Sequence, residues 1–217
     1  MKKHLVIIGA RGFGREVFGF AHQVAAFQRG EFDIKGFLDD KADLLDGYPC
    51  PYGDYPPILG PVETYEPQPD DVFFCALGDA KWRRVYSGKM LAKGGEFISL
   101  ISPEAHVSNA ATIGRGVMIC SWTSVSTNVR IGDFTIVHPL CNFGHDVRVG
   151  SYCTIESHVF MGGFSEMGDG STLHVRAGII PKKRIGRNVS VGFGSVVMRN
   201  FGDDVHVFGN PAKTMDF

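Results

Sequence analysis

The sequence lacks a long apolar run, a paired-cysteine motif and an excess of either charge. Its apolar stretches fall well short of the ~20 residues that span a bilayer. The 22 Lys and Arg residues nearly balance the 23 Asp and Glu residues, which leaves a net charge of −1. This balance favours neither nucleic acid nor a membrane surface as a partner, and we expect neither.

The five cysteines are an odd number, and no two of them form a C-x-x-C pair. Three of them, Cys120, Cys141 and Cys153, fall where the repeat described next takes small side chains. We therefore expect reduced, structural cysteines in a cytoplasmic protein.

What the sequence does have is a period of six residues, from residue 101 to residue 197. Every sixth position is apolar, in a chain that is 44% hydrophobic overall. The apolar positions are Ile101, Val107, Ile113, Ile119, Val125, Ile131, Val137, Phe143, Val149, Ile155, Met161, Met167, Leu173, Ile179, Ile185, Val191 and Val197. Positions four residues later are small or β-branched in the first half of the repeat, and glycine often follows the apolar residue.

This period matches neither a helix nor a simple strand. It is typical of a solenoid in which each hexad forms one short strand and a corner. Three hexads would close a triangular coil, and successive coils would stack as parallel strands about 4.8 Å apart. We therefore predict an all-β parallel β-helix from residue 101.

The first hundred residues show a different pattern. Apolar strands are expected at 5–8, 34–38, 72–78 and 97–100, and helices after the first and third of them. The second helix, at 79–94, is expected to turn inward Trp82, Val85, Tyr86, Met90 and Leu91. The order predicts a small α/β domain with a Rossmann-like parallel sheet. We place it at residues 1–100, and the β-helix with its C-terminal tail at residues 101–217.

The glycines after the first strand have the spacing G-x-x-G-x-G, at Gly9, Gly12 and Gly14. The dinucleotide fingerprint is G-x-G-x-x-G, so that motif is absent. Backbone amides where a helix begins still favour an anion. Asp39 and Asp40, at the carboxyl end of the second strand, could accept hydrogen bonds from ribose or uracil. The alternative is a tight turn that only starts a helix.

His145 is the leading candidate for chemistry. It follows an inward position by two residues and can face outward near a corner, with Asp146 beside it. A carboxylate can hold an imidazole in one tautomer and raise its basicity, as a general base requires. Gly163, one coil further on, could offer a backbone N–H to a bound ligand. The alternative is a surface histidine with a solvated neighbour.

His138, Glu156 and His174 are spaced so that they stack on successive coils. The two histidines would lie roughly 9.6 Å apart, too far to share one zinc ion. We predict no metal site within one chain, and a zinc hydratase would need histidines from two chains. The column is expected to line a subunit interface or an acceptor pocket.

Taken together, these features resemble the bacterial hexapeptide-repeat sugar acetyltransferases related to sialic acid O-acetyltransferase. The nearest branch N-acetylates nucleotide-linked 4-amino-4,6-dideoxy sugars in bacillosamine and perosamine synthesis. The resemblance covers the whole length of the chain. It rests on the segments 8–15 (IGARGFGR), 37–40 (FLDD), 76–78 (ALG), 144–146 (GHD) and 209–213 (GNPAK), and on the hexads.

This resemblance implies a left-handed β-helix, a homotrimer and acetyl-CoA bound between subunits. It implies His145 with Asp146 as catalytic residues, and a nucleotide-sugar site that we assign to Gly9, Gly12, Phe13, Gly14, Asp39 and Asp40, with His138 in the acceptor pocket. It also implies coenzyme A contacts with the backbone around Gly163, Ala177 and Gly178 and with the tail near Pro211, to which the basic residue Lys183 can be added. Lys183 could instead belong to a solvated turn. Phe13 and Thr154 stand where relatives often have histidine.

We therefore predict an acetyl-CoA-dependent N-acetyltransferase acting on a nucleotide-linked amino sugar. One alternative is an O-acetyltransferase that acts on a sialic-acid-like or capsular sugar with the same base. The others are a zinc hydratase and a non-catalytic scaffold that binds a sugar nucleotide.

Overall fold

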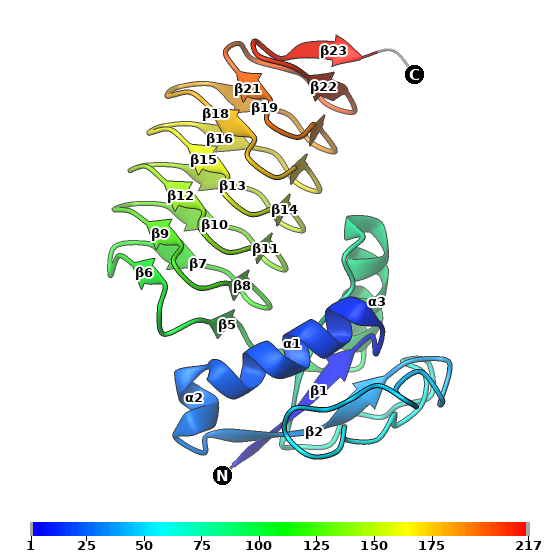
Figure 1. Cartoon of the computed structure of the whole chain (residues 1–217). Coiled ribbons are helices and arrows are strands. Elements are labelled where there is room, and N and C mark those ends of the chain that lie inside the picture. Colours follow the sequence, from blue (N-terminus) through cyan, green and yellow to red (C-terminus); the bar gives the residue numbers. More distant parts are fainter. Residues whose placement is uncertain (1, 216–217) are drawn as a thin grey trace. The chain divides into compact units, whose positions relative to one another are not determined.

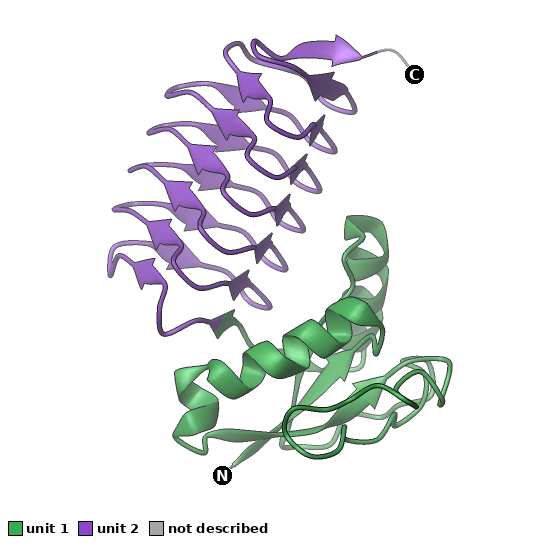
Figure 2. Cartoon of the chain, in the orientation of Figure 1, with its two compact units in different colours: residues 1–100 green, residues 101–217 purple. Residues whose placement is uncertain are grey.

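The computed structural model describes residues 2–215. It has two compact units, residues 1–100 and residues 101–217 (Figure 2). The division falls where the six-residue period begins.

The first unit contains a four-stranded parallel sheet with strand order β2-β1-β3-β4 (Figure 1). The chain pairs β1 with β2 on one side and with β3 on the other, so the carboxyl ends of β1 and β3 form a switch point. The α/β prediction is confirmed. The elements are β1 (Lys3–Ile8), α1 (Gly12–Gln23), α2 (Ala25–Gln28), β2 (Phe32–Leu38), β3 (Asp71–Cys75), α3 (Ala80–Ala92) and β4 (Glu96–Phe97).

The glycine turn after β1 lets α1 pack closely on the strand. Gly9 has φ 99°, a conformation that side chains resist. A Cβ placed on Gly14 would lie 2.1 Å from the carbonyl oxygen of Gly9. Gly14 is buried, and its lack of a side chain allows α1 to pack closely against the end of β1.

Helix α3 buries Met90, as predicted, but it turns Arg83 and Ser87 inward in place of Trp82. Trp82 is 51% exposed, whereas Arg83, Ser87 and Met90 are buried. The guanidinium of Arg83 donates from Nη1 to the carbonyl oxygens of Leu77 and Gly78, at 2.7 and 2.9 Å. These bonds satisfy part of the buried charge and fix the loop before α3. The inward placement of Trp82 was therefore wrong.

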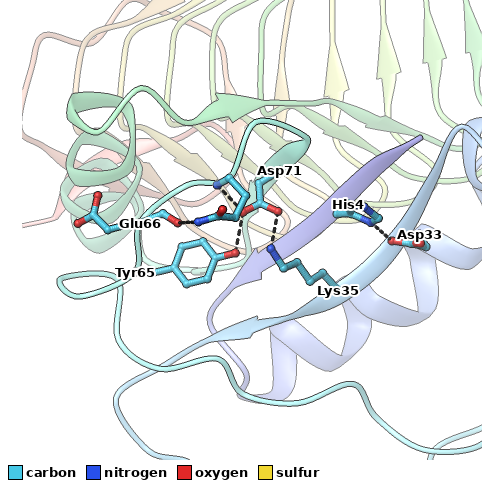
Figure 3. Close-up of polar contacts among 7 residues, drawn as sticks. His4, Asp33, Lys35, Tyr65, Glu66 and Asp71 are labelled. Carbon is cyan, nitrogen blue, oxygen red and sulfur yellow. Dashed lines mark hydrogen bonds and ion pairs between the residues drawn. The ribbon is translucent and has the colours of Figure 1, made fainter. Parts of the chain in front are cut away.

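A buried carboxylate, Asp71, ties the loop before β3 to the sheet (Figure 3). Lys35 Nζ donates to one of its oxygens at 2.7 Å, and Tyr65 Oη donates to the other at 2.7 Å. The backbone N–H of Gln68 adds a third bond at 2.9 Å. Burial alone would raise the pKa of Asp71, but the bonds from Lys35 and Tyr65 outweigh it and lower that pKa below its usual value.

Asp71→Asn should destabilise the protein by about 1–3 kcal/mol at neutral pH, because Lys35 then loses its buried counter-ion. The folded-state pKa of Asp71 lies below the unfolded one. Its stabilisation is therefore complete above the unfolded pKa of about 3.9 and is lost as the pH falls through the lower folded value. Urea unfolding of both proteins across this range measures the difference. Asp43→Asn, at an exposed loop position, is the control. An equal loss in both variants would contradict the assignment.

The second unit is a parallel β-helix built from two-residue strands (Figure 1). Paired strands lie 18 residues apart, as in Arg130 opposite Arg148, so three hexads make one coil as predicted. The eight-stranded sheet contains β5 (Leu100–Ile101), β8 (Met118–Ile119), β11 (Ile136–Val137), β14 (Thr154–Ile155), β17 (Thr172–Leu173), β20 (Ser190–Val191), β22 (His206–Phe208) and β23 (Lys213–Met215). The six-stranded sheet contains β6 (His106–Val107), β9 (Ser124–Val125), β12 (Asn142–Phe143), β15 (Phe160–Met161), β18 (Gly178–Ile179) and β21 (Val196–Val197). The five-stranded sheet contains β7 (Thr112–Ile113), β10 (Arg130–Ile131), β13 (Arg148–Val149), β16 (Glu166–Met167) and β19 (Arg184–Ile185).

The interior of the coils holds the apolar and small residues that the period predicted. Val137 and Ile155 have no exposed surface, and neither do Cys141 and Cys153. Burial raises the pKa of the Cys141 thiol to about 12, which keeps it protonated and unreactive. All five cysteines are free, in agreement with the expectation of reduced side chains.

The C-terminal segment extends the β-helix beyond residue 197, where the six-residue period ends. Strand β22 continues the eight-stranded sheet, with His206 opposite Ser190, and β23 returns antiparallel to it. This coil is two residues shorter than the others, so the six-residue period could not detect it.

None of the helices in residues 2–215 is both long enough and apolar enough to cross a membrane.

Candidate functional site

His145 and Asp146 form a hydrogen-bonded pair at the corner between β12 and β13. Nδ1 of His145 lies 2.9 Å from Oδ2 of Asp146. The other carboxylate oxygen accepts a bond from Nδ2 of Asn128, one coil away, at 3.2 Å. Asp146 has φ 61°, in the left-handed region that aspartate tolerates better than most residues. The predicted pair is thus in hydrogen-bond contact.

The electrostatics of this pair suit a base. The hydrogen bond from His145 is the main cause that lowers the pKa of Asp146, and Asn128 and Arg148 act in the same direction. An ionised carboxylate can only accept, so the proton between the two residues resides on Nδ1. The other ring nitrogen, Nε2, then carries a lone pair and can take a proton.

Gly163 leaves open space beside that nitrogen. A Cβ at this position would lie 3.0 Å from Nε2 and 3.1 Å from Cε1 of His145. The ring of Phe164 meets the imidazole edge to face, at 5.0 Å between centroids and an angle of 86°. The base and the glycine that we assigned to one site are therefore adjacent. The His145 side chain is 59% exposed in the single chain.

His145→Ala should raise the pKa of Asp146 toward its usual value, because the strongest bond to its ionised form is lost. Asn128→Ala should cause a smaller rise, since it removes a weaker contribution. Carboxyl-carbon NMR titration of the wild type and both variants measures this. The Asp203 carboxylate, held by Arg187, serves as an internal control. An unchanged Asp146 titration in His145→Ala would rule out the pair in solution.

The polar column (His138, Glu156 and His174) occupies successive coils as predicted. Nδ1 of His174 lies 3.1 Å from Oε1 of Glu156, whose second oxygen accepts the N–H of Val175 at 2.9 Å. Across residues 2–215, no group of three or more His, Cys, Asp or Glu side chains is arranged to hold a metal ion.

The predicted coenzyme A contacts do not all face the surface. Ala177 is buried in the coil interior, and its N–H and C=O are bonded to His174 and Phe160. The predicted contact at Ala177 was with the backbone, and it stays a prediction. Gly178 lies on the six-stranded sheet next to Phe160, Lys183 is half-buried, and Pro211 is exposed.

The first unit holds a pocket of about 390 Å³ at the carboxyl ends of its strands. Of the predicted substrate residues, Gly9, Asp39 and Asp40 line it, whereas Gly12, Phe13 and Gly14 do not. The residues that line it are Ile8, Gly9, Arg11, Leu38, Asp39, Asp40, Val62, Leu77, Gly78, Asp79, Trp82 and Tyr86. Sequence reasoning missed Arg11, Asp79, Trp82 and Tyr86. The signal in the sequence that could have pointed to this pocket was a tryptophan, Trp82, in the first turn of a helix.

Of the three acidic residues that line this pocket, Asp39 and Asp40 are adjacent but have different tasks. Oδ2 of Asp39 accepts the N–H of Ala10 at 3.0 Å, so this carboxylate secures the turn after β1. Asp40 is next to it and lines the same pocket. Helix α1 begins at Gly12, its N-cap residue Arg11 makes no side-chain cap bond, and its first turn has no acidic residue. Its positive end therefore remains suited to an anion.

Two protein-family models match the chain. Residues 4–90 match the PglD N-terminal domain, and residues 128–163 match the bacterial transferase hexapeptide (six repeats). The two matches fall in the first and the second compact unit, respectively.

Three individual proteins bear on function. GDP-perosamine N-acetyltransferase of Escherichia coli O157:H7 is 27% identical over 96% of this chain and 95% of its own length. UDP-N-acetylbacillosamine N-acetyltransferase of Bacillus subtilis is 28% identical, over 54% of this chain and 51% of its own. The crystal structure of PerB from Caulobacter crescentus, in complex with CoA and GDP-perosamine, is 27% identical and has a TM-score of 0.85, covering 98% of this chain and 97% of PerB.

The resemblance inferred from the sequence is therefore confirmed: the chain is a relative of the bacterial hexapeptide-repeat sugar N-acetyltransferases of the perosamine and bacillosamine type.

Proposed function

We propose that this protein transfers the acetyl group of acetyl-CoA to the amine of a nucleotide-linked 4-amino-4,6-dideoxy sugar. The observation that carries the proposal is the His145–Asp146 pair, with Nε2 open beside Gly163. Similarity along almost the full length to a protein bound to CoA and GDP-perosamine supports the same reaction.

In this mechanism His145 is the general base. Its Nε2 removes a proton from the sugar amine as the nitrogen attacks the thioester carbonyl. A C–N bond forms, the C–S bond breaks and the thiol of coenzyme A leaves. Asp146 keeps the imidazole in the tautomer that can accept the proton. Both substrates are bound side by side, so no acyl-enzyme is needed.

The backbone of Gly163 is proposed to stabilise the oxyanion. Gly144 lets this backbone approach, because a Cβ at Gly144 would lie 2.7 Å from the nitrogen of Gly163. Lys183, Gly178 and Pro211 remain proposed contacts for coenzyme A.

The nucleotide is proposed to bind in the pocket of the first unit. The start of α1 and Arg11 would face its phosphates. Asp40 would accept hydrogen bonds from the base or ribose, while Asp39 holds the turn. Trp82, exposed at the lip, offers a flat apolar surface for stacking. His138 is proposed to line the acceptor pocket.

Assembly and location form part of the same proposal. We infer left-handed coils and a homotrimer in which coenzyme A lies between neighbouring subunits, because hexapeptide-repeat relatives imply this arrangement. A pair as exposed as His145 and Asp146 gains a closed site only when another surface covers it. The five free cysteines support a reducing cytoplasm.

His145→Ala should lower acetyl transfer by about 10²–10⁴-fold, as the loss of a general base predicts. Thiol release from acetyl-CoA, measured with a panel of nucleotide-linked 4-amino sugars, tests this. His106→Ala, an exposed histidine in the first coil, is the matched control. Undiminished turnover in His145→Ala would overturn the assignment of His145 as the general base. Release only with hydroxyl acceptors would move the protein to O-acetylation.

Asp40→Asn should weaken nucleotide-sugar binding roughly 10–100-fold, because a hydrogen bond to a charged acceptor is lost. Isothermal titration with GDP- and UDP-linked amino sugars measures the Kd. Asp43→Asn, in the following loop and exposed, should bind like the wild type. Equal Kd values for Asp40→Asn and the wild type would exclude this carboxylate from the nucleotide site.

A further inference from the structure

A second histidine, His174, belongs to a hydrogen-bonded chain of three side chains that the proposed acetyl transfer does not use. Its Nδ1 lies 3.1 Å from Oε1 of Glu156, and its Nε2 lies 3.2 Å from Oγ of Ser190. The remaining oxygen of Glu156 accepts the N–H of Val175, which fixes the carboxylate. The three residues come from three successive coils of the eight-stranded sheet.

The order of groups is carboxylate, imidazole, hydroxyl. The carboxylate of Glu156 accepts, so Nδ1 carries the proton and Nε2 can accept the proton of Ser190. This is the arrangement that activates a serine nucleophile, and it is recognised by geometry and not by fold. Each of the three side chains is partly exposed, so the chain of bonds opens to the surface.

A largely apolar pocket of about 310 Å³ adjoins this triad. It is lined by His174, Ser190, Gly192, His206, Val207, Phe208 and Met215. The ring of Phe208 packs directly on Gly192, where a Cβ would lie 2.3 Å from it, so this ring forms one wall of the pocket. Gly192 also follows His174 by one coil, as Gly163 follows His145. Nucleophile, base and an apolar cavity therefore meet at one place.

We propose that Ser190, His174 and Glu156 form an acyl-ester hydrolase site for short apolar acyl groups, with a nucleophile and a base that the proposed acetyl transfer does not use. Ser190 Oγ attacks the ester carbonyl, and its proton passes through His174 Nε2 to the departing alcohol as the ester C–O bond breaks. Water, with its proton taken by His174, then attacks the acyl-serine and releases the acid and free Ser190. His206, opposite Ser190 in the ladder and lining the pocket, is placed to donate to the oxyanion.

The test uses the full-length protein with p-nitrophenyl acetate and p-nitrophenyl butyrate. Nitrophenolate release should fall at least about 100-fold in Ser190→Ala and in His174→Ala. Thr172→Ala, on the same face one coil earlier, is the matched control and should hydrolyse both esters at the wild-type rate. Nitrophenolate release should fall less in Glu156→Gln than in His174→Ala, since the base, His174, remains.

Labelling of the wild type with a fluorophosphonate keeps the proposal testable if a variant fails to fold. Peptide mass spectrometry should find the label on Ser190. No label at Ser190, or full hydrolysis by Ser190→Ala, would overturn the proposal. Acetyl transfer from acetyl-CoA to an amino sugar should be unchanged in Ser190→Ala. Failure of this site therefore leaves the proposed transfer reaction untouched, and the reverse holds as well.

Discussion

The constraint on which the second unit depends is the left-handed backbone conformation at its corners. Residues such as Phe134, Asp146 and Phe164 have φ near 60° there, at a cost of roughly 1–2 kcal/mol each. Each of these N–H groups donates to a carbonyl of the preceding coil, as Asp146 does to Thr127 at 3.0 Å. The bonds between coils and the burial of one apolar residue per hexad outweigh the strain. A regular stack results.

This constraint also creates the candidate base. Consecutive residues of an ordinary strand point to opposite faces, so a histidine and the aspartate after it would be separated. At the corner, the left-handed turn at Asp146 brings its carboxylate back to Nδ1 of His145. Asn128 from the preceding coil and Gly163 from the next then set the carboxylate and clear space at Nε2. The strain of the turn and the chemistry of the pair therefore have one origin.

The sequence predicted the features that recur with the six-residue period, and it missed those that depend on single contacts. One apolar residue in six recurs from Ile101 to Val197, and the interior of those coils follows from it. The His145–Asp146 pair could also be predicted, since His145 has a fixed place in the six-residue period. The burial of Arg83 on α3 could not be predicted. It depends on hydrogen bonds to the backbone carbonyl oxygens of Leu77 and Gly78, and a backbone position does not show in the pattern of side chains. The last coil, with His206 opposite Ser190, is shorter than the others and does not follow the six-residue period, so it was not predicted.

A stack of coils places side chains about 4.8 Å apart in columns, and side chains that lean along the column can bond across this gap, as Asn128 does to Asp146 at 3.2 Å. A histidine bridges that gap when it can lean along the column, and a glycine in the next coil permits this. Gly163 does so beside His145, and Gly192 lies one coil after His174, which reaches Ser190 on the neighbouring strand. One coil after His138 stands Glu156, and one coil after His158 stands Arg176. A glycine one coil further on thus marks the two histidines, His145 and His174, that the proposed reactions use.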